Sequence, residues 1–305
     1  TLGSPVAMWI ENKDFANWTE AMSPAPPEGE IDRKENTRVV PGHADFPGAL
    51  KYLAHDMRNV LERSSARETA ARVAAGAVAM AFLDSFGIEI HIQVASIGTI
   101  DAEVADDSDW AAIEESDVRT ADPDTAQKFR DAIDEAKANR TTIGGVFQVA
   151  AIGVPLGLGS HIQWDRKLDG RIAQAMMSIN AVKGVEIGEG MSAAMLTGEL
   201  NADEISMGPD GPVYSSNHAG GILGGISTGQ DIVLRFAVKP TSSILTTRKT
   251  ITKSGEDTEI ITKGRHDPCV GIRAVPVGEA MMACVLLDHM LLHRGQVGEN
   301  RGIIG

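Results

Sequence analysis

A run of small side chains at residues 66–86 is the feature that most constrains how this chain can fold. Apolar positions at three- and four-residue spacing predict a helix, and Gly87 follows as a typical C-terminal stop. Because the face carries almost no bulk, another element can pack closely against it. The small residues that define this expected face are Ala71, Ala74, Ala75 and Val78.

The segment that leads into this helix combines basic and hydroxyl side chains. Ser65 and Glu68 have the spacing of a capping box, so we expect Ser65 to cap the helix. The free N–H groups of a first helical turn favour anions, and Arg63, Ser64 and Arg67 lie beside it. The segment therefore predicts a phosphate or carboxylate site. The alternative is an ordinary capped surface helix with solvated arginines.

The rest of the chain mixes strand and helix patterns. Residues 23–36 are proline-rich and charged and predict a loop, and the acidic residues 101–122 predict an exposed excursion. Strands are predicted at 6–12, 88–98, 144–155 and 231–240, with a hairpin at 247–264 that turns at 254–256. Further helices are predicted at 122–139, opened by Asp122-Pro123, at 169–182, and at 277–293, with a stop at Gly295.

This order has no regular strand–helix–strand rhythm and contains no internal repeat. A doubly wound nucleotide-binding fold is therefore not favoured, and the class expected is α+β. The length of 305 residues suits one large domain or two ordinary ones, and an apolar fraction of 43% is enough for a packed core.

Composition excludes several classes of function. A formal net charge of −14 argues against binding to nucleic acid or to an anionic membrane. The longest apolar stretch, 280–292, is interrupted by Asp288 and His289, so no membrane span is predicted. Cys269 and Cys284 form no zinc motif, and together with the histidines they predict no metal site. Two cysteines in so long a chain favour a reducing, cytoplasmic environment.

Three segments outside the helix carry side chains suited to chemistry. His43, next to Asp45 in a turn, could exchange a proton near neutral pH, or could simply be a structural histidine. Arg265 could bind an anion with Asp267 as its partner or as a base, or the two could form a surface ion pair. The hydroxyl-rich segment 239–243 suits a phosphate group, although such loops are common.

Six segments of this chain, taken in order, resemble the chorismate synthase family. They are PGHAD (41–45), RSSARETAARVAAG (63–76), the segment 157–190, NHAGGILGGISTGQ (217–230), KPTSS (239–243) and GRHDPCVGIRAVPVGEAM (264–281). The resemblance implies one domain over 1–305, a β–α–β sandwich with helices between antiparallel sheets, and a homotetramer. It also implies a lyase that removes phosphate from 5-enolpyruvylshikimate 3-phosphate to give chorismate, using reduced FMN.

The resemblance also implies roles for particular residues. His43 and Asp267 match the residues assigned to proton transfer at the flavin, and Arg67 and Arg265 match substrate-binding arginines. Whether NADPH reduces the flavin on the same protein is left open. The positions that match FMN contacts are Arg63, Ser64, Ser65, Asn180, Ala181, Gly224, Lys239, Pro240, Thr241, Ser242, Ser243 and Arg265.

Two departures from the family pattern stand out. A Gly-Glu-Ser-His-Gly motif with a second histidine is absent, and Thr1 matches a point well inside the family sequence, so we expect an N-terminally truncated chain with little or no activity by itself. Val40 replaces an arginine, and Arg38 lies two residues away, about 6.6 Å along a strand. The alternatives are a non-catalytic FMN-binding homologue and a structural homologue that binds neither ligand.

Overall fold

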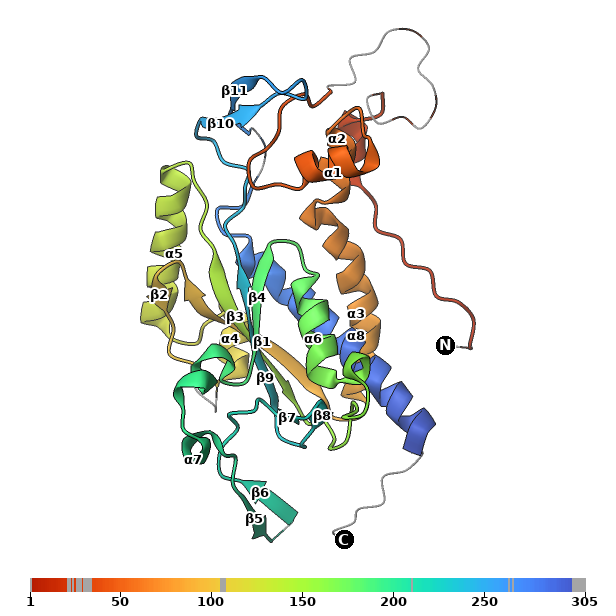
Figure 1. Cartoon of the computed structure of the whole chain (residues 1–305), viewed down its shortest axis with the longest axis vertical. Helices are drawn as coiled ribbons and strands as arrows, with labels where there is room; N and C mark the ends of the chain where they lie inside the picture. Colours follow the sequence, from red (N-terminus) through yellow and green to blue (C-terminus); the bar gives the residue numbers. More distant parts are fainter. Residues whose placement is uncertain are drawn as a thin grey trace.

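The centre of the computed structural model is a five-stranded antiparallel sheet in the order β2-β1-β3-β9-β4 (Figure 1). The structure describes residues 2–20, 23, 25, 29, 35–104, 108–209, 211–262, 264 and 266–297. The strands of the central sheet are β1 (Glu89–Ile97), β2 (Ile100–Asp101), β3 (Gly145–Ile152), β4 (Val182–Ile187) and β9 (Ile232–Val238).

Strand β9 confirms the alternation expected from the sequence, whereas β3 is buried at five consecutive residues. Ile232, Leu234, Phe236 and Val238 of β9 are buried, and the residues between them are more exposed. Phe147 of β3 pairs with Phe236, and their rings stack with centroids 5.5 Å apart. This aromatic pair lies on the buried face of the sheet, which is why the predicted strands at 88–98, 144–155 and 231–240 all form.

Helices α3, α6 and α8 pack against the sheet (Figure 1). The fold is therefore α+β, as expected; the described residues form one large antiparallel sheet with helices packed on it. The helices are α1 (Asp45–Tyr52), α2 (Arg58–Arg63), α3 (Thr69–Asp84), α4 (Trp110–Glu115), α5 (Pro123–Ala138), α6 (Leu168–Met177), α7 (Gly198–Asn201) and α8 (Gly271–Val297), with 3₁₀ turns η1 (Lys13–Asn17), η2 (Ala66–Glu68), η3 (Trp164–Arg166) and η4 (Gly190–Met195).

The alanine-rich helix packs closely, as predicted, but through a different face. Gly76 touches Ala280 of α8 so tightly that a Cβ on Gly76 would clash with it. The buried residues of α3 are Gly76, Ala79 and Leu83, whereas Val78 is 54% exposed. The predicted buried face of α3 is wrong, because glycine permits the closest approach between two helices. The helix therefore turns Gly76 toward α8. The helix ends at Asp84 with Ser85 as its C-cap, earlier than the predicted stop at Gly87, whose φ is +71°.

Helix α8 begins earlier than predicted, since Pro276 lies inside it and not at its start. Its length and composition would allow it to cross a membrane. However, Val275, Met282 and Leu286 are completely buried against the rest of the chain. These contacts are those of a helix in a protein core.

Several other predictions need correction. No strand forms at 6–12, and the helix expected at 169–182 ends at Met177, with β4 beginning at Val182. The stretch 101–122 is not simply exposed, because α4 buries Ile113; residues 105–107 lie outside the described part. Asp122 does cap α5, as predicted.

The described residues also form three two-stranded sheets: β5 (Ile205–Gly208) with β6 (Gly211–Tyr214), β7 (Ile222–Leu223) with β8 (Ile226–Ser227), and the predicted hairpin of β10 (Arg248–Ile251) and β11 (Asp257–Ile260).

Candidate functional site

Three segments that are distant in sequence meet at the end of the sheet where β9 stops and β4 starts. The N–H of Lys239 donates to the carbonyl of Ala181 at 2.9 Å. The ammonium of Lys239 donates to the carbonyl of Gly42 at 2.7 Å, and Gly42 lies against Ser242. We call the turn 41–43, the pair 180–181 and the segment 239–243 the site cluster.

The arginine–serine segment joins the site cluster through Asn180. The side-chain amide of Asn180 donates to the carbonyl of Ser64 at 3.0 Å. Ser65 caps the following turn by accepting the N–H of Arg67, but the reciprocal half of the predicted capping box is missing. Glu68 instead forms an ion pair with Arg72 at 2.8 Å, because a full guanidinium outcompetes a backbone N–H for that carboxylate.

The two predicted arginines of this segment differ in their contacts. Arg67 contacts the N-terminal residues, since its guanidinium donates to the side-chain oxygen Oδ1 of Asn12 at 2.5 Å and lies 3.8 Å from Asp14. Arg63 ends α2 with an exposed side chain. Both cations therefore lie near the site cluster in a chain that is otherwise strongly acidic.

His43 is half-buried in the turn that contacts Lys239. Burial lowers the pKa of His43 below its ordinary value; the Asp45 carboxylate opposes this decrease and the Lys239 ammonium adds to it. Asp45 does not orient the imidazole by a direct hydrogen bond, because its oxygens accept the N–H groups of Val40 (2.7 Å) and Phe46 (2.9 Å). The imidazole is thus neutral near pH 7 and can accept or relay a proton.

Buried polar atoms without a partner concentrate in the site cluster. Among the described residues, six buried side-chain atoms make no hydrogen bond, and four of them belong to this cluster or to the arginine beside it. Unpaired buried polar atoms are costly, so their concentration at one place indicates a site that a polar ligand completes. The four atoms are Nδ1 of His43, Oδ1 of Asn180, Oγ1 of Thr241 and Nε of Arg248.

Arg248 is a functional candidate that the sequence did not reveal. Its guanidinium donates to the carbonyl of Pro41 at 3.1 Å, and burial lowers its pKa, although an arginine remains charged. Val40 is only 3% exposed, and Arg38 turns away to donate to the carbonyl of Glu259. Arg248, and not Arg38, therefore supplies positive charge at the turn 41–43.

Asp267 lies at the beginning of the segment that leads into α8. Its carboxylate forms an ion pair with Arg273 at 2.9 Å and borders a cavity of about 620 Å³ that also contacts Asp117, Arg130 and Cys269. Burial raises the pKa of the Cys269 thiol. Arg265, its expected partner, lies outside the described residues.

Gly224 lies far from the site cluster. It forms the turn between β7 and β8 with φ of +60°, and no atom outside its own neighbours would approach a Cβ there closer than 4.0 Å. The hairpin is near the start of β9, whereas Lys239 follows its end, so the two are at opposite ends of the sheet (Figure 1). The structure therefore brings the other described flavin-contact candidates close together, and Gly224 lies apart from them.

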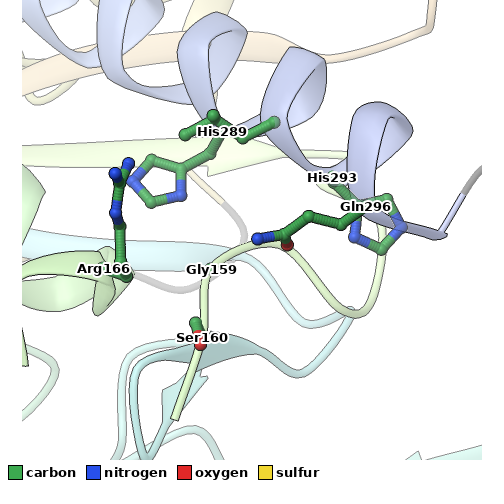
Figure 2. A pocket seen from close by; sticks show the side chains of 7 residues that line it. Gly159, Ser160, Arg166, His289, His293 and Gln296 are labelled. Carbon is green, nitrogen blue, oxygen red and sulfur yellow. The ribbon is translucent and has the colours of Figure 1, made fainter. Parts of the chain in front are cut away.

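A smaller pocket lies near the hairpin end of the molecule. Figure 2 shows Arg166 pointing toward His289 of α8, with Ser160 below them. Its volume of about 20 Å³ fits one water molecule and not a flavin. Burial lowers the pKa of His289, although Asp288 opposes the decrease.

Comparison with known proteins points to one family. Residues 1–291 match the family model for chorismate synthase. The chain is 61% identical to the chorismate synthase of Roseobacter denitrificans and 58% identical to that of Ruegeria pomeroyi, in each case over 100% of this chain and 80% of the relative. A crystal structure of chorismate synthase superimposes with a TM-score of 0.71 at 44% identity, covering 83% of this chain and 71% of the other.

Proposed function

The chain belongs to the chorismate synthase family of lyases, and on this premise we propose how its own residues serve the reaction. The proposed reaction is a 1,4-elimination of phosphate from 5-enolpyruvylshikimate 3-phosphate that yields chorismate and requires reduced FMN. When bound, reduced FMN supplies an electron transiently to the allylic system and recovers it, so there is no net redox change.

The observation that carries this proposal is the group of unpartnered buried atoms in the site cluster. A flavin ring offers both donors and acceptors, and Asn180 Oδ1, Thr241 Oγ1 and His43 Nδ1 require such partners. The residues present therefore fit a flavin. The ammonium of Lys239 and the hydroxyls of Ser242 and Ser243 suit its phosphate, and the hydrogen bond from the Lys239 N–H to the Ala181 carbonyl holds the start of this segment.

His43 is proposed to exchange a proton with the flavin. Its lowered pKa keeps the ring neutral in the free protein, so it is ready to accept a proton. An anionic ligand beside the ring would favour the imidazolium and allow it to give the proton back. Asp267 is proposed to take part in proton removal, held in place by Arg273.

Substrate phosphate would be bound by the cations around the site cluster. Negative charge grows on the leaving phosphate, and fixed cations stabilise it where it develops. Arg67 and Arg265 are proposed for this role by the resemblance, and Arg248 is added from its position beside Pro41. Concentrating cations here also offsets the repulsion that the net charge of −14 exerts on an anionic substrate.

Anaerobic turnover with chemically reduced FMN tests this proposal. We expect a version of the chain that carries the family's Gly-Glu-Ser-His-Gly segment to convert 5-enolpyruvylshikimate 3-phosphate to chorismate only when flavin is present, whereas residues 1–305 alone should give little or no chorismate. A motif-carrying version that binds FMN but gives no chorismate would support the non-catalytic alternative. A folded chain that binds neither FMN nor substrate would overturn the assignment of the site cluster.

A further inference from the structure

A buried histidine of α8 has no partner for one of its ring nitrogens. Val275, Met282 and Leu286 form a completely buried stripe along α8, and His289 continues this stripe one turn later. Only 3% of His289 is exposed, and its Nε2 makes no hydrogen bond with any described residue. A buried polar atom without a partner is costly, so an imidazole at this position indicates a ligand that completes its hydrogen bonds.

The His289 ring faces a small pocket that is rich in hydrogen-bond donors. Figure 2 shows the Arg166 guanidinium and the Gln296 amide pointing into the same space as the ring. The hydroxyl of Ser160 also lines the pocket. It accepts the N–H of Ile162 at 3.2 Å and has no acceptor for its own hydrogen among the described residues. Donors from α8, from η3 and from the loop before η3 therefore converge on one place.

The charges beside the pocket favour an anion over a metal ion. Asp288, next to His289 in the chain, lies 3.8 Å from the guanidinium of Arg171 on α6. Arg166, in contrast, forms no ion pair with any described residue. The part of the chain that the structure describes also has no group of metal ligands, although His289 and His293 are four positions apart on one helix. A guanidinium without a counter-ion binds oxyanions and repels cations, so the pocket suits an anion.

The size of the pocket determines how much of a ligand enters it. Its volume of about 20 Å³ accommodates one water-sized group, and therefore one oxygen atom of an anion. The rest of the ligand lies outside, where the exposed side chains of Arg166 and Gln296 are available to its other oxygens. A phosphate presents oxygens in several directions, whereas the oxygens of a carboxylate lie in one plane. Donors that converge from separate elements therefore suit a phosphate better.

We propose that this pocket binds a phosphate group, with one oxygen on His289 Nε2 and others on the Arg166 guanidinium. A neutral imidazole donates through one nitrogen, and phosphate at Nε2 favours the form that carries its hydrogen there. Burial lowers the pKa of His289, although Asp288 opposes the decrease. The guanidiniums of Arg171 and Arg166 lower it further, so the ring is neutral before phosphate binds. Because the pocket lies beside β8 at the hairpin end, phosphate binding here is independent of the proposed flavin function.

A titration with inorganic phosphate tests the proposal, with the magnetic resonance signals of isotope-labelled histidine rings as the readout. At neutral pH and constant ionic strength, we expect the His289 signal to move and then saturate, while the other ring signals serve as references. Arg166→Gln changes an exposed side chain and should weaken phosphate binding at His289 by about tenfold or more. The His289 signal is the one missing from His289→Gln. Should that buried substitution prevent folding, it is the signal that Arg166→Gln displaces most before phosphate is added.

The matched control is Arg294→Gln. Arg294 lies in the last turn of the same helix, is exposed and does not line the pocket. This variant loses the same charge as Arg166→Gln, but its phosphate affinity should stay close to that of the unaltered chain. A His289 signal that does not move would overturn the proposal and leave the pocket to a water molecule. Equal phosphate affinities in Arg166→Gln and in the unaltered chain, or equal losses in both variants, would also overturn it.

Two further anions identify the part of the ligand that is bound. Acetate should bind about tenfold more weakly than phosphate, and acetate binding of equal strength would overturn the assignment to phosphate. Methyl phosphate that moves the His289 signal as inorganic phosphate does would support a site for the phosphate group of an ester. Binding of inorganic phosphate but not of methyl phosphate would support a site for the free ion.

Discussion

The two ends of the central sheet use similar residues in opposite ways. At the hairpin end, Asp203 accepts hydrogen bonds from Ser216, His218 and Ala219. In the site cluster, comparable polar atoms of His43 and Asn180 are buried without partners. Polar groups that hydrogen-bond to one another stabilise the fold, whereas buried polar groups without a partner indicate a place where a ligand binds. The hairpin end holds one such atom, Nε2 of His289, so the concentration of unpaired groups, and not polarity as such, locates the site.

The largest effect on stability is expected from Asp203→Ala. The change leaves the N–H groups of His218 and Ala219 without their acceptor, so it should lower the free energy of unfolding by about 3 kcal/mol. Urea titration measures this loss. Asp165→Ala, which changes an exposed aspartate, is the control and should cost almost nothing.

The same residue gives a dependence on pH. Burial raises the pKa of Asp203, but the hydrogen bonds from Ala219, Ser216 and His218 outweigh burial and lower it overall. Its stabilising contribution is therefore complete above the ordinary aspartate pKa and is lost as the pH falls through the lower folded value. An equal effect of Asp203→Ala at neutral pH and at pH values below the folded pKa would contradict this interpretation.

Lys239→Met should separate binding from stability in the site cluster. The ammonium donates a hydrogen bond to Gly42, and we expect FMN affinity to fall about 10- to 100-fold while stability changes little. Lys183→Met on β4 removes an exposed lysine from the same end of the sheet and should leave affinity unchanged. Comparable losses in both variants would mean that only net charge matters.

Ser227→Ala should weaken the hairpin end by about 1 to 2 kcal/mol. The hydroxyl is 1% exposed and joins Pro155 to Leu158 at 2.6 and 2.9 Å, so both partners lose a hydrogen bond. Thermal unfolding measures the effect. Thr241→Val, which removes a hydroxyl that is buried without a partner at the other end of the sheet, should be nearly neutral. Equal losses in the two variants would contradict the difference between the ends.

The smallest effect is expected from His43. A folded pKa below the ordinary value means that the folded state binds fewer protons, so stability should fall as the pH decreases below about 6.5. His43→Gln should remove this slope, which comparison of urea titrations at pH 5 and pH 8 would detect. An unchanged slope would show that another group carries the dependence.

Local patterns predict the elements of this chain better than the faces they bury. The alternation in 231–240 and the cap at Asp122 depend on nearby residues alone, and the structure confirms them. The buried face of α3 depends on Ala280, which lies some two hundred positions later in the chain, so the local pattern selects the wrong face. Similarly, β4 forms because it pairs with the free edge of β9, and the local sequence of β4 does not indicate this pairing.

The sequence predicts the segments that form the candidate site but not how these segments are arranged in space. The segments 41–45, 63–76 and 239–243 follow from the resemblance, but nothing in the sequence indicates that Gly42 touches Lys239. The sequence does not single out Arg248, because an arginine on an alternating strand has the pattern of a solvated side chain. Its role becomes visible only through its contact with Pro41.

A crystal structure of the chain with bound FMN tests the central claim most directly. We predict the flavin in the site cluster, with its polar atoms on His43 Nδ1, Asn180 Oδ1 and Thr241 Oγ1, and its phosphate beside Lys239. Flavin bound away from the site cluster, with those three atoms still unpaired, would contradict it.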